Sequence, residues 1–223
     1  MNETEVFELV REHVLSIRKQ KPIRVAINGI EGTGKTVFAV KLTKHLISKN
    51  TNAIHVSIDG FHNNKDTRYR QGRNSAKGYY EDSYDEIAFV EKVLKSSQLA
   101  NPHYTTAIHD LKTDQYLDIE PTNIEATTVL ITDGAYLFKP HYRQHWDLRI
   151  YLKTSFEIAM GRGVKRDKDL LGGFELARDK YERRYHKASR IYQTENDPEA
   201  IADIVIDNSD FHNLKIMKNT ATT

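Results

Sequence analysis

Residues 29–36 read Gly-Ile-Glu-Gly-Thr-Gly-Lys-Thr, and this stretch decides the fold of the chain. It follows an apolar run at 23–28, Ile-Arg-Val-Ala-Ile-Asn, and precedes a run with helical character at 37–42, Val-Phe-Ala-Val-Lys-Leu. A strand, a glycine-rich turn and a helix in this order are the setting of a phosphate-binding loop. An ordinary glycine-rich turn is the alternative, and the flanking strand and helix count against it. We therefore predict a nucleoside-triphosphate site here.

Each residue type in this turn has a chemical role toward a polyphosphate. The glycines let the backbone turn with its N–H groups pointing inward, and the helix N-terminus adds partial positive charge. The lysine can neutralise the β- and γ-phosphate oxygens, and the final threonine hydroxyl can ligate Mg²⁺. The predicted nucleotide-binding residues are Gly29, Gly32, Thr33, Gly34, Lys35 and Thr36.

Length and composition are compatible with one α/β domain covering 1–223. The chain has 223 residues and a formal net charge of +2, with acidic and basic residues interspersed, which gives no reason to expect a nucleic-acid or membrane partner. It contains no cysteine, so disulfides, zinc–thiolate sites and a cysteine nucleophile are excluded. No run has the character of a signal sequence or the length of a membrane span, and we expect a cytoplasmic protein.

Strand-like runs alternate with helical stretches along the chain. An amphipathic helix is predicted over 4–18, ended by Pro22, and the polar tail after Asn213 is expected to fray. The alternation is typical of a parallel sheet covered by helices on both faces, so the predicted fold class is α/β. The five predicted strands are 23–28, 53–58, 127–132, 146–152 and 202–207.

A long polar segment follows the second predicted strand. Residues 62–83 are basic and rich in Gly and Tyr, which is typical of a surface segment and not of a core element. Long segments of this kind are often functional, so we predict the wall of an acceptor-substrate site, with a merely solvated insertion as the alternative. A helix is predicted over 84–95 and a hairpin over 104–119. The predicted acceptor-binding insertion covers about residues 62–120.

Two aspartates directly follow predicted strands. Asp59 and Asp133 each come after a β-branched run and precede a glycine. Ligands of open parallel sheets lie outside the carboxyl ends of the strands, so both side chains should face the phosphate loop. Phosphoryl transfer to an alcohol needs a bridging metal ion and a group that orients the hydroxyl or takes its proton. We predict a metal site at Thr36, Asp59 and Asp133, with turn residues that merely close strands as the alternative.

A basic helical region at 155–193 lies between the last two predicted strands and is interrupted by Gly-Gly at 172–173. Arg162 and Arg166 are four residues apart and so share one helix face. Brought over a triphosphate, they would stabilise charge on the transferring group and exclude water. We predict a lid over about residues 160–186, with a solvated helix face as the alternative. The predicted catalytic residues are Lys35, Asp59, Arg162 and Arg166.

The order of these motifs resembles the uridine kinase group of phosphate-loop kinases, whose relatives include phosphoribulokinase and bacterial pantothenate kinase. The resemblance implies a P-loop NTPase sandwich with strand order 2-3-1-4-5, ATP or GTP with Mg²⁺, and transfer of the γ-phosphate to a primary hydroxyl. It also implies that Asp59 acts as the base near Mg²⁺, and that Asp133 stands where the group usually has an acidic metal-site residue. Besides the phosphate loop, it rests on the segments 57–62, 80–85, 132–137, 146–148, 166–167 and 202–206.

On the acceptor side, the resemblance implies that Asp82, or Glu81 in a shifted alignment, contacts a ribose. Uridine kinases read the pyrimidine base with a Tyr and a His from a hairpin, and Tyr104 and His109 have that spacing. In a second register, His109 aligns with the usual Tyr and the base-reading His is missing. His62, which ends the segment 57–62, completes the predicted acceptor residues.

The chain departs from the group in its lid, where Gly163 falls at a common Arg position and Leu171-Gly172-Gly173 replaces the usual Arg-Gly-Arg. The predicted reaction is the phosphorylation of uridine or cytidine to the 5′-monophosphate. Two alternatives stay open: a kinase of another small alcohol, such as a sugar phosphate or a pantothenate-like compound, and a nucleotide-binding regulatory ATPase. The sequence does not fix the oligomeric state, and a homo-oligomer is compatible with it.

Overall fold

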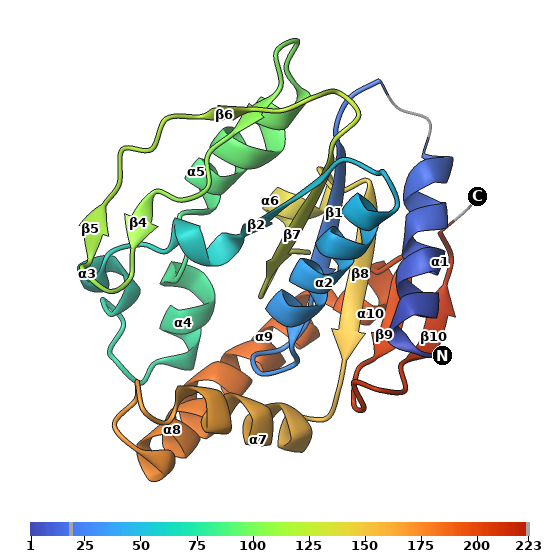
Figure 1. The fold of residues 1–223 in the computed structure, drawn as a ribbon. Coiled ribbons are helices and arrows are strands. Elements are labelled where there is room, and N and C mark those ends of the chain that lie inside the picture. The colour runs from blue at the N-terminus through green and yellow to red at the C-terminus, as the bar shows by residue number, and fades with distance from the viewer. Residues whose placement is uncertain (18–19, 222–223) are drawn as a thin grey trace.

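The computed structural model describes residues 1–17 and 20–221, and it forms a central sheet with helices on both faces (Figure 1). The sheet has six strands in the order β10-β9-β8-β1-β7-β2. Numbered in sequence order within this sheet, its first five strands pair in parallel, and their spatial order is the predicted 2-3-1-4-5. The strands are β1 (Ile23–Asn28), β2 (Ala53–Ser57), β7 (Val129–Gly134), β8 (Leu148–Lys153), β9 (Ile204–Asp207) and β10 (Lys215–Asn219). The predicted α/β fold is confirmed.

The sixth strand corrects the prediction that the tail after Asn213 frays. β10 pairs antiparallel with β9, with Lys215 opposite Asp207 and Asn219 opposite Ile204. The edge of β9 would otherwise present unpaired backbone N–H and C=O groups, and β10 satisfies them. The polar composition of the tail therefore gave no indication that it forms an edge strand.

Successive side chains of β1 point to opposite faces of the sheet, so the sheet divides the core into two halves. Val25 and Ile27 pack with α1 (Glu3–Ser16) and α2 (Lys35–Ser48) on one face. Ala26 faces the other half of the core, which is formed by shorter helices. Burial on both faces explains why the strands are almost uniformly apolar. The helices of the second face are α4 (Ala76–Asp82), α5 (Glu86–Phe89), η2 (Val90–Lys95), α6 (Pro140–Arg143), α9 (His186–Asn196) and α10 (Pro198–Ile201).

The first helix begins at a capping box. The Asn2 side chain accepts a hydrogen bond from the backbone N–H of Glu5, and the Glu5 carboxylate accepts one from the backbone N–H of Asn2. The helix ends at Ser16, and position 18 of the predicted helix lies outside the described residues. None of the described helices has the length and apolar character needed to cross a membrane.

The segment 62–83 contains two helices, α3 (Lys65–Arg68) and α4, and it is not wholly a surface segment. Tyr80 is buried against Tyr136 and Tyr192, so the prediction that this segment contributes no core residue is wrong at α4. A phenol ring buries a large apolar area while its hydroxyl finds a partner, here the Asn196 amide at 2.9 Å.

Short strands follow α5 and η2. The hairpin pairs β4 (His109–Asp110) with β5 (Gln115–Tyr116), which lies within the range predicted for it. Tyr104 lies farther from the turn, where β3 (His103–Tyr104) pairs with β6 (Thr122–Asn123). Tyr104 and His109 therefore lie on the same arm of one hairpin, and the choice between the two predicted registers stays a prediction.

The region predicted as a lid contains parts of α7 (Phe156–Asp167) together with α8 (Phe174–Lys180) and η4 (Tyr181–Tyr185). Gly172 and Gly173 separate the first two helices with φ values of +89° and +119°, a backbone conformation that L side chains rarely adopt. Gly163 lies against the buried ring of Tyr181, and a Cβ atom there would be 2.2 Å from the Tyr181 Cζ atom. The approach of this ring leaves no room for the arginine that is common at that position.

Replacing Gly163 by Ala should therefore lower the free energy of unfolding by about 1–3 kcal/mol, because the added methyl group overpacks the α7–η4 contact. Urea denaturation measures the change. Gly161→Ala is the matched control, since it lies in the same helix and a Cβ atom there meets nothing within 4 Å. A Gly163→Ala protein as stable as the control would contradict this packing.

Candidate active site

The phosphate loop joins β1 to α2 and has the backbone conformation expected of an anion-binding turn. Gly32 and Gly34 have φ values of +86° and +98°, and Gly34 caps the N-terminus of α2 in a left-handed conformation. Thr33 is fully buried and its hydroxyl donates to the Ile30 carbonyl at 2.6 Å, which fixes the loop from inside. The N-terminus of α2 is therefore open to a polyphosphate.

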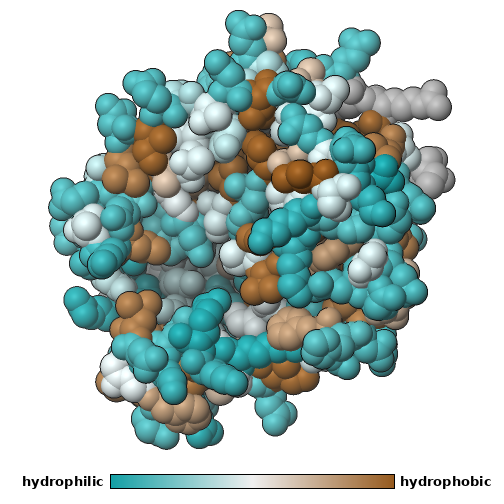
Figure 2. Space-filling view, viewed as in Figure 1, coloured by the Kyte–Doolittle hydropathy of each residue, from teal (hydrophilic) through white to brown (hydrophobic). Residues whose placement is uncertain are grey.

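A cavity of about 90 Å³ lies at the carboxyl ends of β1, β2 and β7, beside this loop. Figure 2 shows a recess in this part of the surface, between α4 and the phosphate loop. The cavity brings together the phosphate loop and both predicted aspartates, as expected for a doubly wound sheet. Its lining residues are Glu31, Gly32, Lys35, Thr36, Asp59, Tyr79, Tyr84, Asp133, Gly134, Ala135 and Arg166.

Asp133 is held in place from two sides. Its Oδ2 accepts a hydrogen bond from the Thr36 hydroxyl at 2.6 Å, and its Oδ1 lies 2.7 Å from His55 Nε2. Burial alone would raise the pKa of the Asp133 carboxyl, but the hydrogen bonds from His55 and Thr36 outweigh it and leave the pKa below its usual value. Asp133 is thus an oriented carboxylate next to the threonine hydroxyl.

Asp59 follows β2 on the short helix η1 (Ile58–Phe61), where the Ser57 hydroxyl caps its backbone N–H. The Tyr84 hydroxyl donates to Asp59 Oδ1 at 3.1 Å. The surrounding protein displaces water and raises the pKa of the Asp59 carboxyl, and the nearby charge of Asp133 adds to this effect. The side chain still reaches solvent through the cavity, so an acceptor hydroxyl can approach it. A carboxylate with a raised pKa is a better proton acceptor.

Lys35 and Arg166 supply the positive charge of the cavity. Lys35 Nζ donates to the Ile30 carbonyl at 2.9 Å, and burial lowers its pKa while Glu31 and Asp133 oppose the change. Arg166 forms two hydrogen bonds to Asp167, at 2.6 and 2.9 Å, which raise the pKa of the guanidinium. Both cations line the cavity that contains Asp59.

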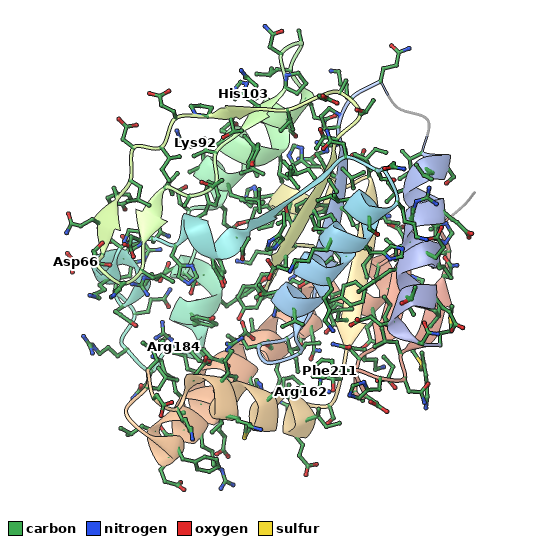
Figure 3. The ribbon with its side chains drawn as sticks, in the orientation of Figure 1. Asp66, Lys92, His103, Arg162, Arg184 and Phe211 are labelled. Atoms are coloured by element: carbon green, nitrogen blue, oxygen red, sulfur yellow. The ribbon has the colours of Figure 1, made fainter. Side chains whose placement is uncertain are left out.

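The structure does not bring Arg162 to this cavity. Its guanidinium donates to the carbonyls of Asn208 and Ser209 at 2.8 and 2.7 Å and lies 3.7 Å from the centre of the Phe211 ring. Figure 3 shows Arg162 and Phe211 together, at the start of the lid and beside the loop after β9. Arg162 Nη1 also lies 3.5 Å from the Thr33 carbonyl oxygen of the phosphate loop, so the role of Arg162 toward a triphosphate stays a prediction.

The two acidic residues predicted to contact a ribose do not line the cavity. Asp82 is buried and accepts hydrogen bonds from Arg70 and from Gln71, the latter at 2.8 Å. Glu81 is exposed and accepts from the same glutamine at 2.9 Å. Their role toward an acceptor stays a prediction.

The three remaining acceptor residues lie at different places. His62 packs edge-on against Tyr84 with ring centres 4.4 Å apart, so it adjoins the cavity. His109 is buried, with its Nε2 3.2 Å from the Asp114 carboxylate. Tyr104 lines a separate hollow with Asn52, at the other end of β2. The structure thus brings His62 to the site and leaves Tyr104 away from it.

The cavity also contains residues that the sequence did not single out as site residues. Tyr84 belongs to the segment 80–85 that carries the family resemblance, and Glu31 belongs to the phosphate loop. The sequence therefore contained an indication for both residues. Glu31 Oε2 accepts from the Ser189 hydroxyl at 2.5 Å. His55 could not be identified, because a histidine within a strand gives no indication of which side chain it contacts.

The oxygen donors at Thr36 and Asp133 fit Mg²⁺, which is usually bound through one or two carboxylates together with substrate phosphates. In the described residues there is no group of three or more His, Asp or Glu that could hold a metal ion without such help. The site therefore suits a metal that arrives with a nucleotide.

The family model described as "Phosphoribulokinase / Uridine kinase family" matches residues 24–205. A uridine kinase from Leuconostoc citreum is 26% identical over 156 residues, covering 68% of this chain and 71% of that protein. The structure of a possible uridine kinase from Bacillus stearothermophilus superimposes with a TM-score of 0.69 at 18% identity, over 89% of this chain and 96% of its own. D-glycerate 3-kinase from Cryptococcus neoformans gives a TM-score of 0.59 at 12% identity, over 96% and 99%. With the phosphate loop and the sheet in the expected arrangement, the chain belongs to the phosphoribulokinase/uridine kinase family and is a kinase.

Proposed function

We propose that this kinase transfers the γ-phosphate of ATP, or of GTP, to a primary hydroxyl of a small molecule, with Mg²⁺ as the metal ion. The observation that carries the proposal is the cavity in which Asp59 faces the phosphate loop, next to the Thr36–Asp133 pair. A nucleotide needs the loop alone, whereas an alcohol acceptor also needs a group for its proton.

The proposed step is a direct displacement. The acceptor oxygen attacks the γ-phosphorus, the bond from the γ-phosphorus to the oxygen bridging to the β-phosphate breaks, and ADP leaves. Asp59 takes the hydroxyl proton, and Tyr84 holds its carboxylate in position. Lys35 and Arg166 stabilise the negative charge on the transferring group. We propose that the region predicted as a lid, residues 160–186, excludes water through Arg166.

Thr36 and Asp133 would hold Mg²⁺, which neutralises phosphate charge when it is bound. Replacing His55 by Phe should raise the Mg²⁺ concentration for half-maximal activity by about 10-fold, because residues that orient a metal-binding carboxylate typically contribute this much to affinity. Steady-state rates over a Mg²⁺ titration measure the change. The control is His141→Phe, at an exposed histidine. Equal Mg²⁺ dependence in both variants would contradict the role of His55.

Pyrimidine nucleosides are the first acceptor candidates, because the Leuconostoc citreum relative is a uridine kinase. The experiment is a coupled assay of ADP formation with uridine and cytidine, followed by identification of the phosphorylated product. Other small alcohols are the alternative acceptors. The position of Tyr104, which lies away from the cavity, supports this alternative. ADP formation that no alcohol stimulates would contradict the proposed function.

A further inference from the structure

We propose that the acceptor of this kinase carries a phosphate or carboxylate group, which binds at a buried cationic subsite next to the cavity. The subsite consists of Arg68, Lys180 and Arg184 around the ring of Tyr69, and Arg184 also contacts the ring of Tyr79. The inference rests on the proposed function, since it names the chemical class of the acceptor for the same site.

Arg184 is the central residue of the subsite. It is only 3% exposed, and its guanidinium lies between Tyr69 and Tyr79, at 4.7 and 5.0 Å from the two ring centres. Besides a hydrogen bond to Tyr69, the guanidinium donates a long one, 3.5 Å, to the Arg68 carbonyl, and its Nε has no partner among the described residues. A guanidinium has five N–H donors, and a buried charge is normally paired. Among the described residues, Arg184 therefore has no anionic partner.

The surroundings of Arg184 do not supply an anion either. Arg68 lies beside Arg184, and its own Nε also has no hydrogen-bond partner. Asp114 contacts Arg68 at 3.4 Å, but neither Arg184 nor Lys180 forms an ion pair with a carboxylate among the described residues. The carboxylates of residues 1–17 and 20–221 thus leave these two buried or half-buried cations without a counter-charge, and an anionic ligand would provide it.

The titratable groups around the subsite report the same excess of positive charge. Burial would raise the pKa of Tyr69, but the hydrogen bond from Arg184 and the charges of Lys180 and Arg68 outweigh burial and lower it. Burial, together with Arg68 and Arg184, lowers the pKa of His62 to about 3. His62 is therefore neutral, and the subsite attracts an anion without a contribution from that histidine.

The subsite adjoins the reaction cavity directly. Tyr79 lines the cavity and also contacts the Arg184 guanidinium. Tyr84 lines the cavity on the other side and packs on His62, which lies in the field of Arg184. Figure 3 shows Arg184 between α4 and the helices α7 and α8, to the left of Arg162. A small molecule with a hydroxyl at Asp59 would reach Arg184 past the Tyr79 ring, which forms the wall shared by the cavity and the subsite.

The γ-phosphate is a poorer candidate for this position. Lys35 and Arg166 already serve the phosphates at the cavity, whereas Arg184 lies behind the Tyr79 ring. If Arg184 binds the acceptor, its replacement should change the KM for the acceptor and leave the KM for ATP. That separation distinguishes an acceptor subsite from a second nucleotide contact.

The test uses pairs of acceptors that differ mainly in the anionic group: glycerol with glycerate, and fructose with fructose 6-phosphate, together with uridine. We expect kcat/KM for the anionic member of at least one pair to exceed that of its neutral member by about 10- to 100-fold, the range of a hydrogen bond to a charged group. The first pair reports a carboxylate and the second a phosphate.

Arg184→Gln should remove this preference through a higher KM for the acceptor, and Arg184→Lys should restore part of it. Arg183→Gln is the matched control, because Arg183 is adjacent, 69% exposed in its side chain and paired with Asp179 at 2.6 Å. It should keep the preference. Circular dichroism and thermal unfolding check that the variants fold. The comparison of anionic with neutral acceptors uses the wild-type enzyme, so it does not depend on the folding of any variant.

Calorimetric titration of the wild-type enzyme with glycerate and fructose 6-phosphate, in the presence of Mg²⁺ and a non-hydrolysable ATP analogue, decides the case in which none of these compounds is phosphorylated. Arg184-dependent binding of either anion keeps the subsite, even if the proposed reaction fails. A wild-type enzyme that phosphorylates uridine and prefers neither anion overturns the subsite and leaves the proposed function intact. Absence of both the preference and the binding also overturns the subsite.

Discussion

Replacement of Asp59 by Asn should lower kcat for phosphoryl transfer by about 10²- to 10⁴-fold while nucleotide binding is retained, because the amide cannot accept the hydroxyl proton. The carboxylate lies in the cavity with Lys35 and receives a hydrogen bond from Tyr84, so the isosteric amide fits the same space. Steady-state rates with a saturating acceptor give kcat, and titration with a non-hydrolysable ATP analogue gives the nucleotide affinity.

Asp118→Asn controls for the loss of one negative charge, since Asp118 is exposed and lies outside the cavity. It should behave as the wild type in both measurements. An Asp59→Asn enzyme that keeps wild-type kcat would remove Asp59 from the mechanism. A loss of nucleotide affinity without a loss of kcat would instead assign Asp59 to the metal site.

The phosphate half of the site could be predicted from the sequence because its information is local. The spacing within 29–36 fixes the loop. Asp59 follows β2, and Asp133 lies at the carboxyl end of β7, the strand parallel and adjacent to β2. Once the strand order is known, the two aspartates must lie near Thr36. The fold followed from the same alternation of strands and helices, apart from the edge strand β10, which has a polar composition.

The acceptor half could not be predicted in the same way, because it depends on contacts between distant segments. The ring of Tyr79 meets Arg184 only because α4 packs against the helices of the lid region. Arg162 and Tyr104 fit the expected motifs in sequence, yet other contacts hold them away from the cavity, at Phe211 and at the far end of β2. Spacing along the chain does not encode these contacts.

The second large effect is expected at Gly32, where the phosphate loop touches α7. A Cβ atom at this position would lie 2.0 Å from the Ala159 carbonyl oxygen, and the backbone φ of +86° is itself unfavourable for an L side chain. The obstacle is backbone and cannot rotate away. Gly32→Ala must therefore displace the loop, the helix or both, and we expect it to lower the free energy of unfolding by about 2–4 kcal/mol.

Gly32→Ala should also lower nucleotide affinity by about 10-fold or more, because the loop N–H groups would no longer converge on the phosphates. Thermal unfolding and titration with the ATP analogue measure the two effects. Gly72→Ala separates the causes, since Gly72 has a φ of +100° but a Cβ atom there meets nothing within 4 Å. That control carries the conformational cost of about 1–2 kcal/mol without the clash and should keep full nucleotide affinity. If both variants lose the same stability and neither loses affinity, the contact between the loop and α7 does not shape the nucleotide site.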